Sequence, residues 1–260
     1  MFEMEPRLVK LIPKNNTSGS SNEFGLVLVA GWETPPNDLK ECYESTLNKI
    51  SNCFDKNDIQ NSSSHHTDLY LPAVYLYPHQ SLHVTIATLY PPTEEDSLSN
   101  DEKSHIIQFW NSILNQASRN NEWPKERLKL RISSAQIGEK AGIFLWDELT
   151  GGIKGMRSAI SQELADYKNQ MTHPFENNLV TNVRLPNIIH STFMRFAKTP
   201  TSSWMDVQDK FQTHIIPSLK TTFFTKDFIL SDATLVNEKK PFMHIPRDDQ
   251  HIIKTFTFGL

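Results

Sequence analysis

The chain has 260 residues, of which 38% are hydrophobic and 22% are charged, and its formal net charge is −4. This composition is typical of a globular protein with room for one large domain or two small lobes. The weakly acidic balance excludes a general basic surface for long duplex nucleic acid, so any phosphate substrate must be held by local groups. No run approaches the ~18 apolar residues of a membrane span, so no membrane partner is expected.

The N-terminal residues and the two cysteines indicate the compartment. Residues 1–16 are mixed and charged, without the apolar core of a signal peptide. Cys42 and Cys53 lie 11 residues apart in a predicted helix, about three turns, which is too far for a disulfide. Two lone thiols without an export signal favour a reducing compartment. We expect a cytoplasmic protein, with the nucleus as the alternative, in which both cysteines are structural.

The first half of the chain predicts strands and helices in alternation. Short apolar runs bounded by turn residues predict strands, and apolar residues at helical spacing predict helices. The predicted elements are a strand over 24–30, a helix over 39–54 capped by Asn37 or Asp38, a polar loop over 55–68, strands over 70–77 and 82–89, a turn at Pro91-Pro92, and a helix over 101–119.

The second half predicts a similar alternation with one long helix. Its elements are strands over 128–137 and 142–146 joined by residues 138–141, a turn over 147–152, a helix over 153–171, an irregular link over 174–186, a strand over 188–197, a helix over 203–219, and strands over 223–236 and 251–259. In the long helix, Met156, Ile160, Leu164 and Tyr167 share one face, which indicates core. The turn over 147–152 has two glycines but lacks the Lys-Ser/Thr of a phosphate-binding loop.

Two histidines lie in apolar, strand-like runs and are each followed two residues later by threonine. They occur in Leu82-His83-Val84-Thr85-Ile86 and Ile189-His190-Ser191-Thr192-Phe193. Residues i and i+2 of a strand point to the same face, so each run presents an imidazole beside a hydroxyl. Two such pairs across a cleft would supply a general base, a general acid and two phosphate-binding hydroxyls. That set is a metal-free apparatus for opening or closing a phosphodiester.

The pattern His-x-Ser/Thr is weak by itself, because ten histidines and 43 serine or threonine residues give about 1.7 matches by chance. The chain has four matches. His65 with Thr67 lies in the polar loop, and His79 with Ser81 precedes the strand. A lone histidine in an apolar strand is more often a core residue than a catalyst, so the hypothesis depends on the pair.

The surroundings of the two strand motifs repeat. His83 and His190 are 107 residues apart, and each strand is followed by a proline-containing turn, a helix and a strand. Two such halves can pack about a pseudo-twofold axis, which would bring the two strands together at one cleft.

With this order of elements, the paired motifs resemble those of the two-histidine (2H) phosphoesterase superfamily, which includes bacterial 2′-5′ RNA ligase-like proteins and plant and fungal cyclic nucleotide phosphodiesterases. The resemblance extends over residues 24–259. It implies a single bilobal α+β domain over 24–260 with the LigT-like fold, in which antiparallel sheets surround a central cleft and helices lie outside. Residues 1–23 form an N-terminal extension without a clear counterpart in the family, and the loop at 55–68 resembles an insertion.

The same resemblance implies roles for the four motif side chains. His83 and His190 would act as general acid and base, and Thr85 and Thr192 would donate hydrogen bonds to the non-bridging phosphate oxygens. The expected activity is that of a monomeric phosphodiesterase, without metal or cofactor, acting on the 2′,3′-cyclic phosphate or the 2′-5′ or 3′-5′ phosphodiester of a nucleotide or RNA end. The natural substrate, the direction (hydrolysis or ligation) and the assignment of acid and base stay open.

Four further side chains are weaker candidates for substrate binding. Arg195 lies three residues after Thr192, so strict alternation places it on the opposite face unless the strand contains a bulge. Tyr75, Tyr77 and Trp146 could stack on a base, although aromatic residues in strands usually belong to the core.

Three other interpretations stay open. A metal-dependent hydrolase could use His65-His66-Thr67-Asp68, but the chain has no His-Glu-x-x-His or Cys-x-x-Cys spacing. A non-catalytic module of the same fold would bind an RNA end or a nucleotide without turnover. A plain α+β domain would contain the motifs by accident.

Overall fold

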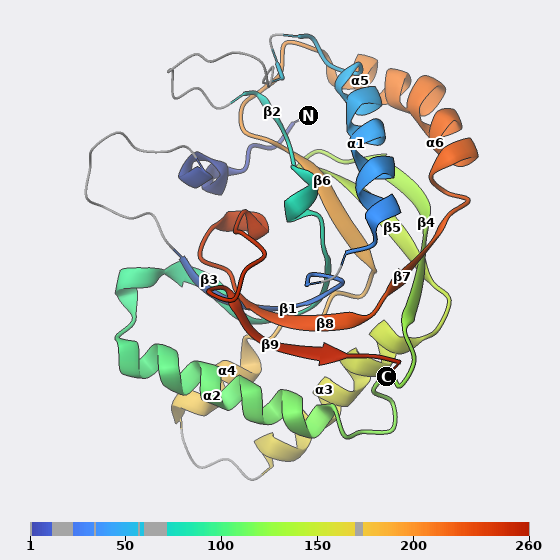
Figure 1. Ribbon diagram of the computed structural model, residues 1–260. Helices are drawn as coiled ribbons and strands as arrows, with labels where there is room; N and C mark the ends of the chain where they lie inside the picture. The colour runs from blue at the N-terminus through green and yellow to red at the C-terminus, as the bar shows by residue number, and fades with distance from the viewer. Residues whose placement is uncertain are drawn as a thin grey trace.

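Two antiparallel sheets form the centre of the fold, and helices lie on their outer sides (Figure 1). The computed structural model describes residues 2–11, 23–33, 35–56, 58–59, 72–169 and 174–259. The strands are β1 (Glu23–Ala30), β2 (Val74–Leu76), β3 (Val84–Glu94), β4 (Leu128–Ile137), β5 (Ala141–Glu148), β6 (His190–Phe196), β7 (Asp227–Leu230), β8 (Asp232–Asn237) and β9 (Ile252–Thr257). One sheet has the order β3-β1-β8-β9 and the other has the order β2-β6-β5-β4-β7. The predicted α+β class with antiparallel sheets is confirmed.

The helices flank the sheets in two groups, one beside each sheet (Figure 1). They are α1 (Asn37–Ser51), α2 (Asn100–Ala117), α3 (Gly152–Lys168), α4 (Pro174–Thr181), α5 (Trp204–Lys210) and α6 (Ile216–Thr222), with a π turn, η4 (Phe211–Ile215), between α5 and α6. Short 3-10 turns are η1 (Pro6–Leu11), η2 (His79–Ser81), η3 (Glu95–Ser97) and η5 (Pro241–Met243). No helix in the described part of the chain is long and apolar enough to cross a lipid bilayer.

Local sequence explains several of these boundaries. Strand β4 has the predicted bounds of 128–137. Helix α2 begins at a capping box, in which Ser99 Oγ accepts a hydrogen bond from the Glu102 amide at 3.2 Å and the Glu102 carboxylate accepts one from the Ser99 amide at 2.8 Å. Helix α3 follows Gly151, whose φ of 77° lies in the left-handed region that glycine adopts without strain.

The predicted turn at Pro91-Pro92 is wrong, because both prolines lie inside β3. Proline has no amide hydrogen and is therefore excluded from the middle of a sheet. Strand β3 lies at the edge of its sheet, so one side of it needs no hydrogen-bond partner and the prolines are tolerated there.

Two other local predictions are also wrong. The irregular link predicted over 174–186 contains α4, in which Leu179 is buried in the core and the Glu176 carboxylate accepts a hydrogen bond from Tyr167 of α3 at 2.8 Å. These tertiary contacts stabilise a helix too short to form by itself. Helix α1 starts at Asn37 after Pro36, with no side-chain cap, and it ends before Cys53. Cys42 and Cys53 are both free thiols.

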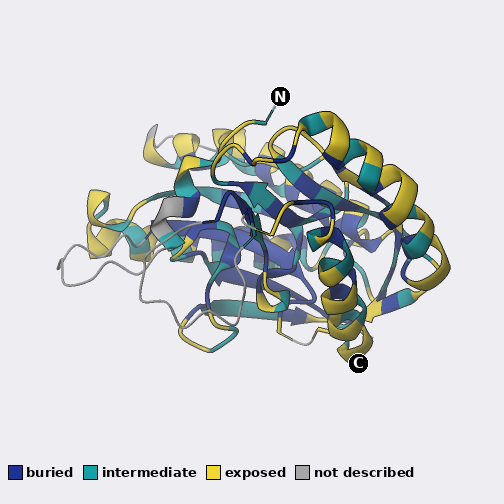
Figure 2. Cartoon of the chain, turned by 90° about the horizontal axis from the view of Figure 1, so that it is seen from above, coloured by how far each residue is buried: buried dark blue, intermediate teal, exposed yellow. Residues whose placement is uncertain are grey.

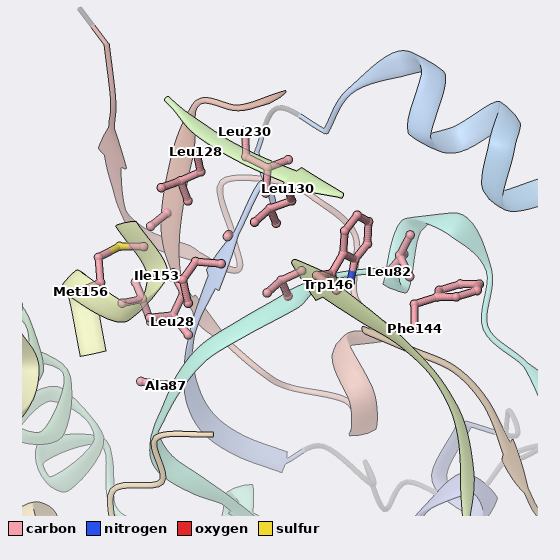
Figure 3. Packing of buried hydrophobic residues seen from close by; sticks show 14 of the residues in the cluster. Leu28, Leu82, Ala87, Leu128, Leu130, Phe144, Trp146, Ile153, Met156 and Leu230 are labelled. Carbon is pink, nitrogen blue, oxygen red and sulfur yellow. The ribbon is translucent and has the colours of Figure 1, made fainter. Parts of the chain in front are cut away.

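One continuous apolar core holds the two sheets together. Leu28 and Ala87 from the first sheet belong to the same buried cluster as Leu130 and Phe144 from the second sheet (Figure 3). Each fully buried leucine or phenylalanine contributes about 1.5–3 kcal/mol to folding. Buried residues occupy the sheets, whereas exposed residues lie on the outer faces of the helices (Figure 2). The shared core therefore fixes the position of one sheet relative to the other.

Candidate active site

The two histidine motifs meet at one cavity between the sheets. His83 immediately precedes β3, although the sequence predicts it inside a strand over 82–89, and Thr85 lies within β3. His190 and Thr192 lie in β6. All four side chains line the same cavity, whose volume is about 230 Å³. Strands from different sheets and remote parts of the sequence therefore present two imidazoles and two hydroxyls to one space.

Strands β3 and β6, which we call the motif strands, share the same local geometry. In β3 the pairing with β1 passes from Thr85 to Ala87, so Ile86 is an extra residue. In β6 the pairing with β5 passes from Thr192 to Met194, so Phe193 is the extra residue. Each motif strand therefore has a bulge directly after the motif threonine.

These bulges change which residues face the cavity. Because one residue is inserted, the third residue after each motif threonine returns to the motif face. That residue is Thr88 in β3 and Arg195 in β6, and both line the cavity. The prediction from strict alternation, which placed Arg195 on the opposite face, is therefore wrong. Gly142 lies beside the β6 bulge, where an added Cβ atom would lie 2.4 Å from both the Phe193 and the Met194 side chains.

A buried hydrogen bond joins the two motifs directly. Ser191 Oγ donates to the backbone carbonyl of His83 at 2.6 Å, and Trp146 Nε1 donates to Ser191 Oγ at 3.0 Å. Ser191 is 1% exposed, so water cannot replace these partners. Ser191, the middle residue of the second motif, thus links β6 directly to the first motif.

Ser191→Ala should lower both stability and turnover. It leaves the His83 carbonyl and the Trp146 indole without this partner, and each unpaired buried group costs about 1–3 kcal/mol. We expect a loss of about 1–3 kcal/mol in urea unfolding and a lower kcat with little change in KM. Ser133→Ala, at an exposed site in β4, is the matched control. Unchanged stability and kcat in Ser191→Ala would contradict this role.

Arg157 of α3 forms hydrogen bonds with the backbone of both motif segments. Its guanidinium donates to the carbonyls of Thr85 at 2.9 Å, Ile86 at 3.0 Å and Ile188 at 3.2 Å. The first two acceptors belong to β3, and the third lies two residues before His190. One buried side chain therefore sets the spacing between the segments that carry the two histidines.

The connections that lead into the two motifs cross to the opposite motif strand. The amide of Tyr77, before the first motif, donates to the carbonyl of Phe193 in β6 at 2.9 Å. Arg184, before the second motif, exchanges two backbone hydrogen bonds of 2.9 Å with Thr88 in β3. The side chains of Tyr77 and Arg184 both line the cavity. The segment before the first motif therefore packs on the strand of the second motif, and the segment before the second motif packs on the strand of the first.

Burial lowers the pKa of both imidazoles, which favours their neutral forms. It lowers the pKa of His83 to about 4, and the charge of Arg247 lowers it further. His83 Nδ1 lies 2.7 Å from the carbonyl of Ser81, so Nδ1 carries the proton and Nε2 is the basic nitrogen. Burial, together with the charges of Arg157 and Arg195, also lowers the pKa of His190.

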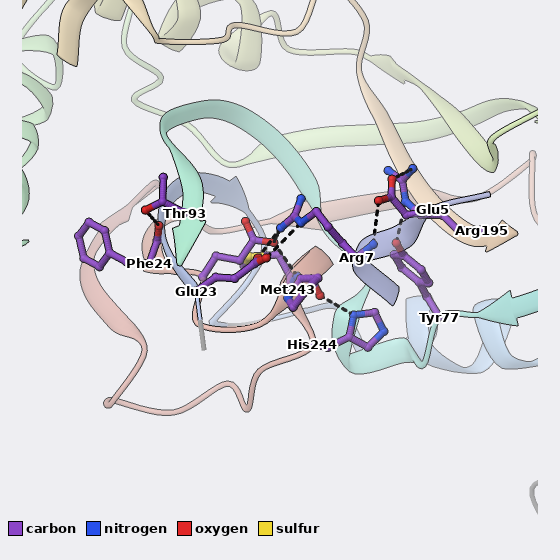
Figure 4. Close-up of polar contacts among 11 residues, drawn as sticks. Glu5, Arg7, Glu23, Phe24, Tyr77, Thr93, Arg195, Met243 and His244 are labelled. Atoms are coloured by element: carbon purple, nitrogen blue, oxygen red, sulfur yellow. Dashed lines mark hydrogen bonds and ion pairs between the residues drawn. The ribbon is translucent and has the colours of Figure 1, made fainter. Parts of the chain in front are cut away.

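Arg195 is held at the cavity by an aromatic and acidic cluster. Its Nε donates to Tyr77 Oη at 3.0 Å, and its Nη1 lies 3.5 Å from the Glu5 carboxylate (Figure 4). Its guanidinium also lies over the Phe242 ring, 4.5 Å from the centroid. Tyr77 is thus tied to the site through Arg195, whereas Tyr75 packs on the His244 ring at 5.2 Å.

The N-terminal residues contribute to the same cavity, which the sequence did not indicate. Arg7 lines it, lies 4.8 Å from the centroid of the Phe242 ring and pairs with Glu23 of β1 at 2.5 Å (Figure 4). Glu238 lies 3.9 Å from Arg7, and burial raises its pKa to about 7. Its carboxylate accepts a hydrogen bond from the amide of Met243 at 3.3 Å.

This last bond stabilises a strained turn at the cavity. Phe242 and Met243 have φ values of 59° and 60°, a conformation that non-glycine residues rarely adopt. The Glu238 carboxylate therefore helps to hold the Phe242 ring beside Arg7 and Arg195.

The remaining predicted candidates lie elsewhere. Trp146 is buried and lines a smaller cavity of about 110 Å³ on which His83 also borders, so its indole is not free to stack on a base in the larger one. His65 to Asp68, the candidate metal ligands, lie outside the described residues. Elsewhere in the described part of the chain, no group of three or more His, Cys, Asp or Glu residues could hold a metal ion.

The protein therefore has an α+β fold with two antiparallel sheets, and its two histidine motifs line one cavity between them. No known family model and no curated protein matches the sequence. Among solved structures, the chain is similar to E. coli LigT complexed with 3′-AMP, with 10% identity and a TM-score of 0.47 over 92% of this chain and 99% of that chain. LigT complexed with phosphate is similar as well, with 10% identity and a TM-score of 0.45 over 92% of this chain and 100% of that chain.

TT0787 of Thermus thermophilus is also similar, with 12% identity and a TM-score of 0.46 over 90% of this chain and 97% of that chain. At these identities the likeness concerns the fold.

Proposed function

We propose that the protein is a metal-independent phosphodiesterase that acts on the 2′,3′-cyclic phosphate or on the 2′-5′ or 3′-5′ phosphodiester of a nucleotide or RNA end. The observation that supports it is the convergence of His83, Thr85, His190 and Thr192 on one cavity. The hydrogen bond of 2.6 Å between Ser191 Oγ and the His83 carbonyl supports the proposal further, because it links the two motif segments.

Two imidazoles on one cavity suit the proton transfers of phosphodiester hydrolysis. One neutral imidazole removes a proton from water as its oxygen attacks phosphorus, and the other, protonated, gives a proton to the ribose oxygen as its bond to phosphorus breaks. A phosphate anion bound near both rings raises both pKa values by charge attraction, which supplies the protonated partner. The reverse sequence would join ends, so the same site serves either direction.

The hydroxyls and Arg195 suit the charge that develops on phosphorus. Thr85 and Thr192 donate hydrogen bonds to the non-bridging oxygens, and the Arg195 guanidinium adds a positive charge on the same face of β6. Donors placed on strands keep their positions during the reaction, so little reorganisation is needed.

The lowered pKa values predict an acidic optimum. The pH profile of kcat/KM reports ionisations of the free enzyme, so it should be a bell centred below 6.5, the ordinary pKa of histidine. The profile of kcat should be displaced to higher pH, because the bound phosphate raises both pKa values. Initial rates measured from about pH 4 to pH 9 test this, and a flat profile across that range would contradict paired imidazole catalysis.

A panel of substrates in excess EDTA tests the function itself. It contains a nucleoside 2′,3′-cyclic phosphate, a 2′-5′ dinucleotide and an RNA with a 3′ tail, and turnover of at least one member without metal is expected. Loss of all activity in EDTA would favour a metal-dependent hydrolase. Binding of these compounds without turnover of any would favour a non-catalytic module.

A further inference from the structure

Three arginine residues line the cavity, and two of them form ion pairs with neighbouring carboxylates. Arg7 pairs with Glu23, and Arg195 pairs with Glu5. Both guanidinium groups also lie over the Phe242 ring. Both guanidinium groups therefore already have a carboxylate partner before any substrate arrives.

Arg184 differs from the other two. It is exposed, and within the described residues its guanidinium makes no ion pair or hydrogen bond. Its backbone, in contrast, is fixed by two hydrogen bonds of 2.9 Å to Thr88 of β3. The backbone of Arg184 is thus fixed beside the motif strand β3, and its side chain brings a positive charge without an ionic partner among the described residues to the cavity.

That position is displaced along β3 from the reacting groups. Thr88 lies three residues after Thr85, which is about 7–10 Å along an extended strand with one bulge. This distance is comparable to the length of one nucleotide. Pro91 and Pro92 line the same end of the cavity, and their rigid apolar rings suit contact with a sugar or a base.

We propose that Arg184 binds a second phosphate group of the substrate, one nucleotide unit away from the phosphorus that reacts. This inference rests on the proposed function and narrows its substrate class. The substrate is a nucleotide or RNA end with at least two phosphates, and a nucleoside cyclic phosphate without a second phosphate is a poorer substrate. A guanidinium binds phosphate through charge-assisted, often bidentate hydrogen bonds, so the second phosphate should increase affinity substantially.

The test compares two substrates that differ by one group, a nucleoside 2′,3′-cyclic phosphate and the same compound with a 5′-phosphate. The wild type should prefer the 5′-phosphorylated compound by about tenfold or more in kcat/KM, mainly through KM. The preference should fall as salt rises, because the contact is exposed. In Arg184→Ala the ratio should approach one, and Arg184→Lys should keep part of it.

The ratio is measured within each variant, so a partial loss of folded protein cancels. Arg119→Ala, at an exposed arginine after α2, is the matched control and should keep the wild-type ratio. A wild-type ratio of one, or an unchanged ratio in Arg184→Ala, would overturn the proposal.

A binding measurement separates this proposal from the proposed function. Calorimetry gives the affinities for a nucleoside 3′-phosphate and a nucleoside 3′,5′-bisphosphate. If no member of the substrate panel is turned over, the proposed function fails, but tighter binding of the bisphosphate that is lost in Arg184→Ala still supports the role of Arg184. Equal affinities in the wild type would overturn it.

Discussion

Replacing His83 or His190 with alanine is expected to lower kcat by about 10²–10⁴-fold, the usual contribution of one general acid or base. The two rings border one cavity and cannot replace each other, because one must accept a proton while the other gives one. The double variant should therefore be little slower than either single variant, since the residues act as a unit. Steady-state kinetics on the best member of the substrate panel gives the three values.

The variant His83→Asn separates the loss of the basic nitrogen from the loss of the hydrogen bond to Ser81. The asparagine side-chain amide can keep a donor near the position of Nδ1, which faces the Ser81 carbonyl, but it has no basic nitrogen in place of Nε2. His83→Asn should therefore be as inactive as His83→Ala while staying closer to wild-type stability. His214→Ala, at an exposed histidine in η4, should keep full activity. Activity within a few-fold of wild type in either motif variant would refute the assignment.

The second large effect is expected at Arg157, a positioning residue. Arg157→Met removes the donor to the carbonyls of Thr85, Ile86 and Ile188 and should destabilise the fold by about 2–4 kcal/mol. The side chain is 9% exposed, so water replaces these hydrogen bonds poorly. Urea unfolding measures the loss.

Kinetics of the milder variant separates positioning from stability. A lysine reaches fewer of the three carbonyls, so Arg157→Lys should recover part of the stability. Under conditions where it is fully folded, its kcat should still be lower by about 10- to 100-fold, because small displacements of catalytic groups are costly. Full activity in folded Arg157→Lys would reduce the residue to a structural role, and Arg119→Ala should change neither property.

The elements with strong local patterns could be predicted from the sequence. Strand β4 alternates apolar and polar residues on both sides of an irregularity at Ser133-Ser134, and α3 has an apolar stripe, so the sequence predicts both elements closely. The motif residues were also identified locally, since His83 with Thr85 and His190 with Thr192 need only a spacing of two within apolar runs.

The features that complete the site depend on partners remote in sequence. The bulges at Ile86 and Phe193 arise from how β3 and β6 pair with β1 and β5, and no local pattern specifies them. They decide that Arg195 faces the cavity. Arg7 and Arg184 reach the cavity through an N-terminal turn and a connecting segment that have no periodicity to interpret.

The central claim is that His83 and His190 act on the same phosphorus atom. The most direct measurement is a titration of the ring nitrogen resonances of ¹⁵N-labelled protein with a nucleoside 2′-phosphate. The signals of both rings should move together with a single saturation curve, toward the protonated form for at least one of them, while His105 and His214 on exposed helical surface stay unchanged. Movement of only one of the two rings at saturation, or of neither, would contradict the account.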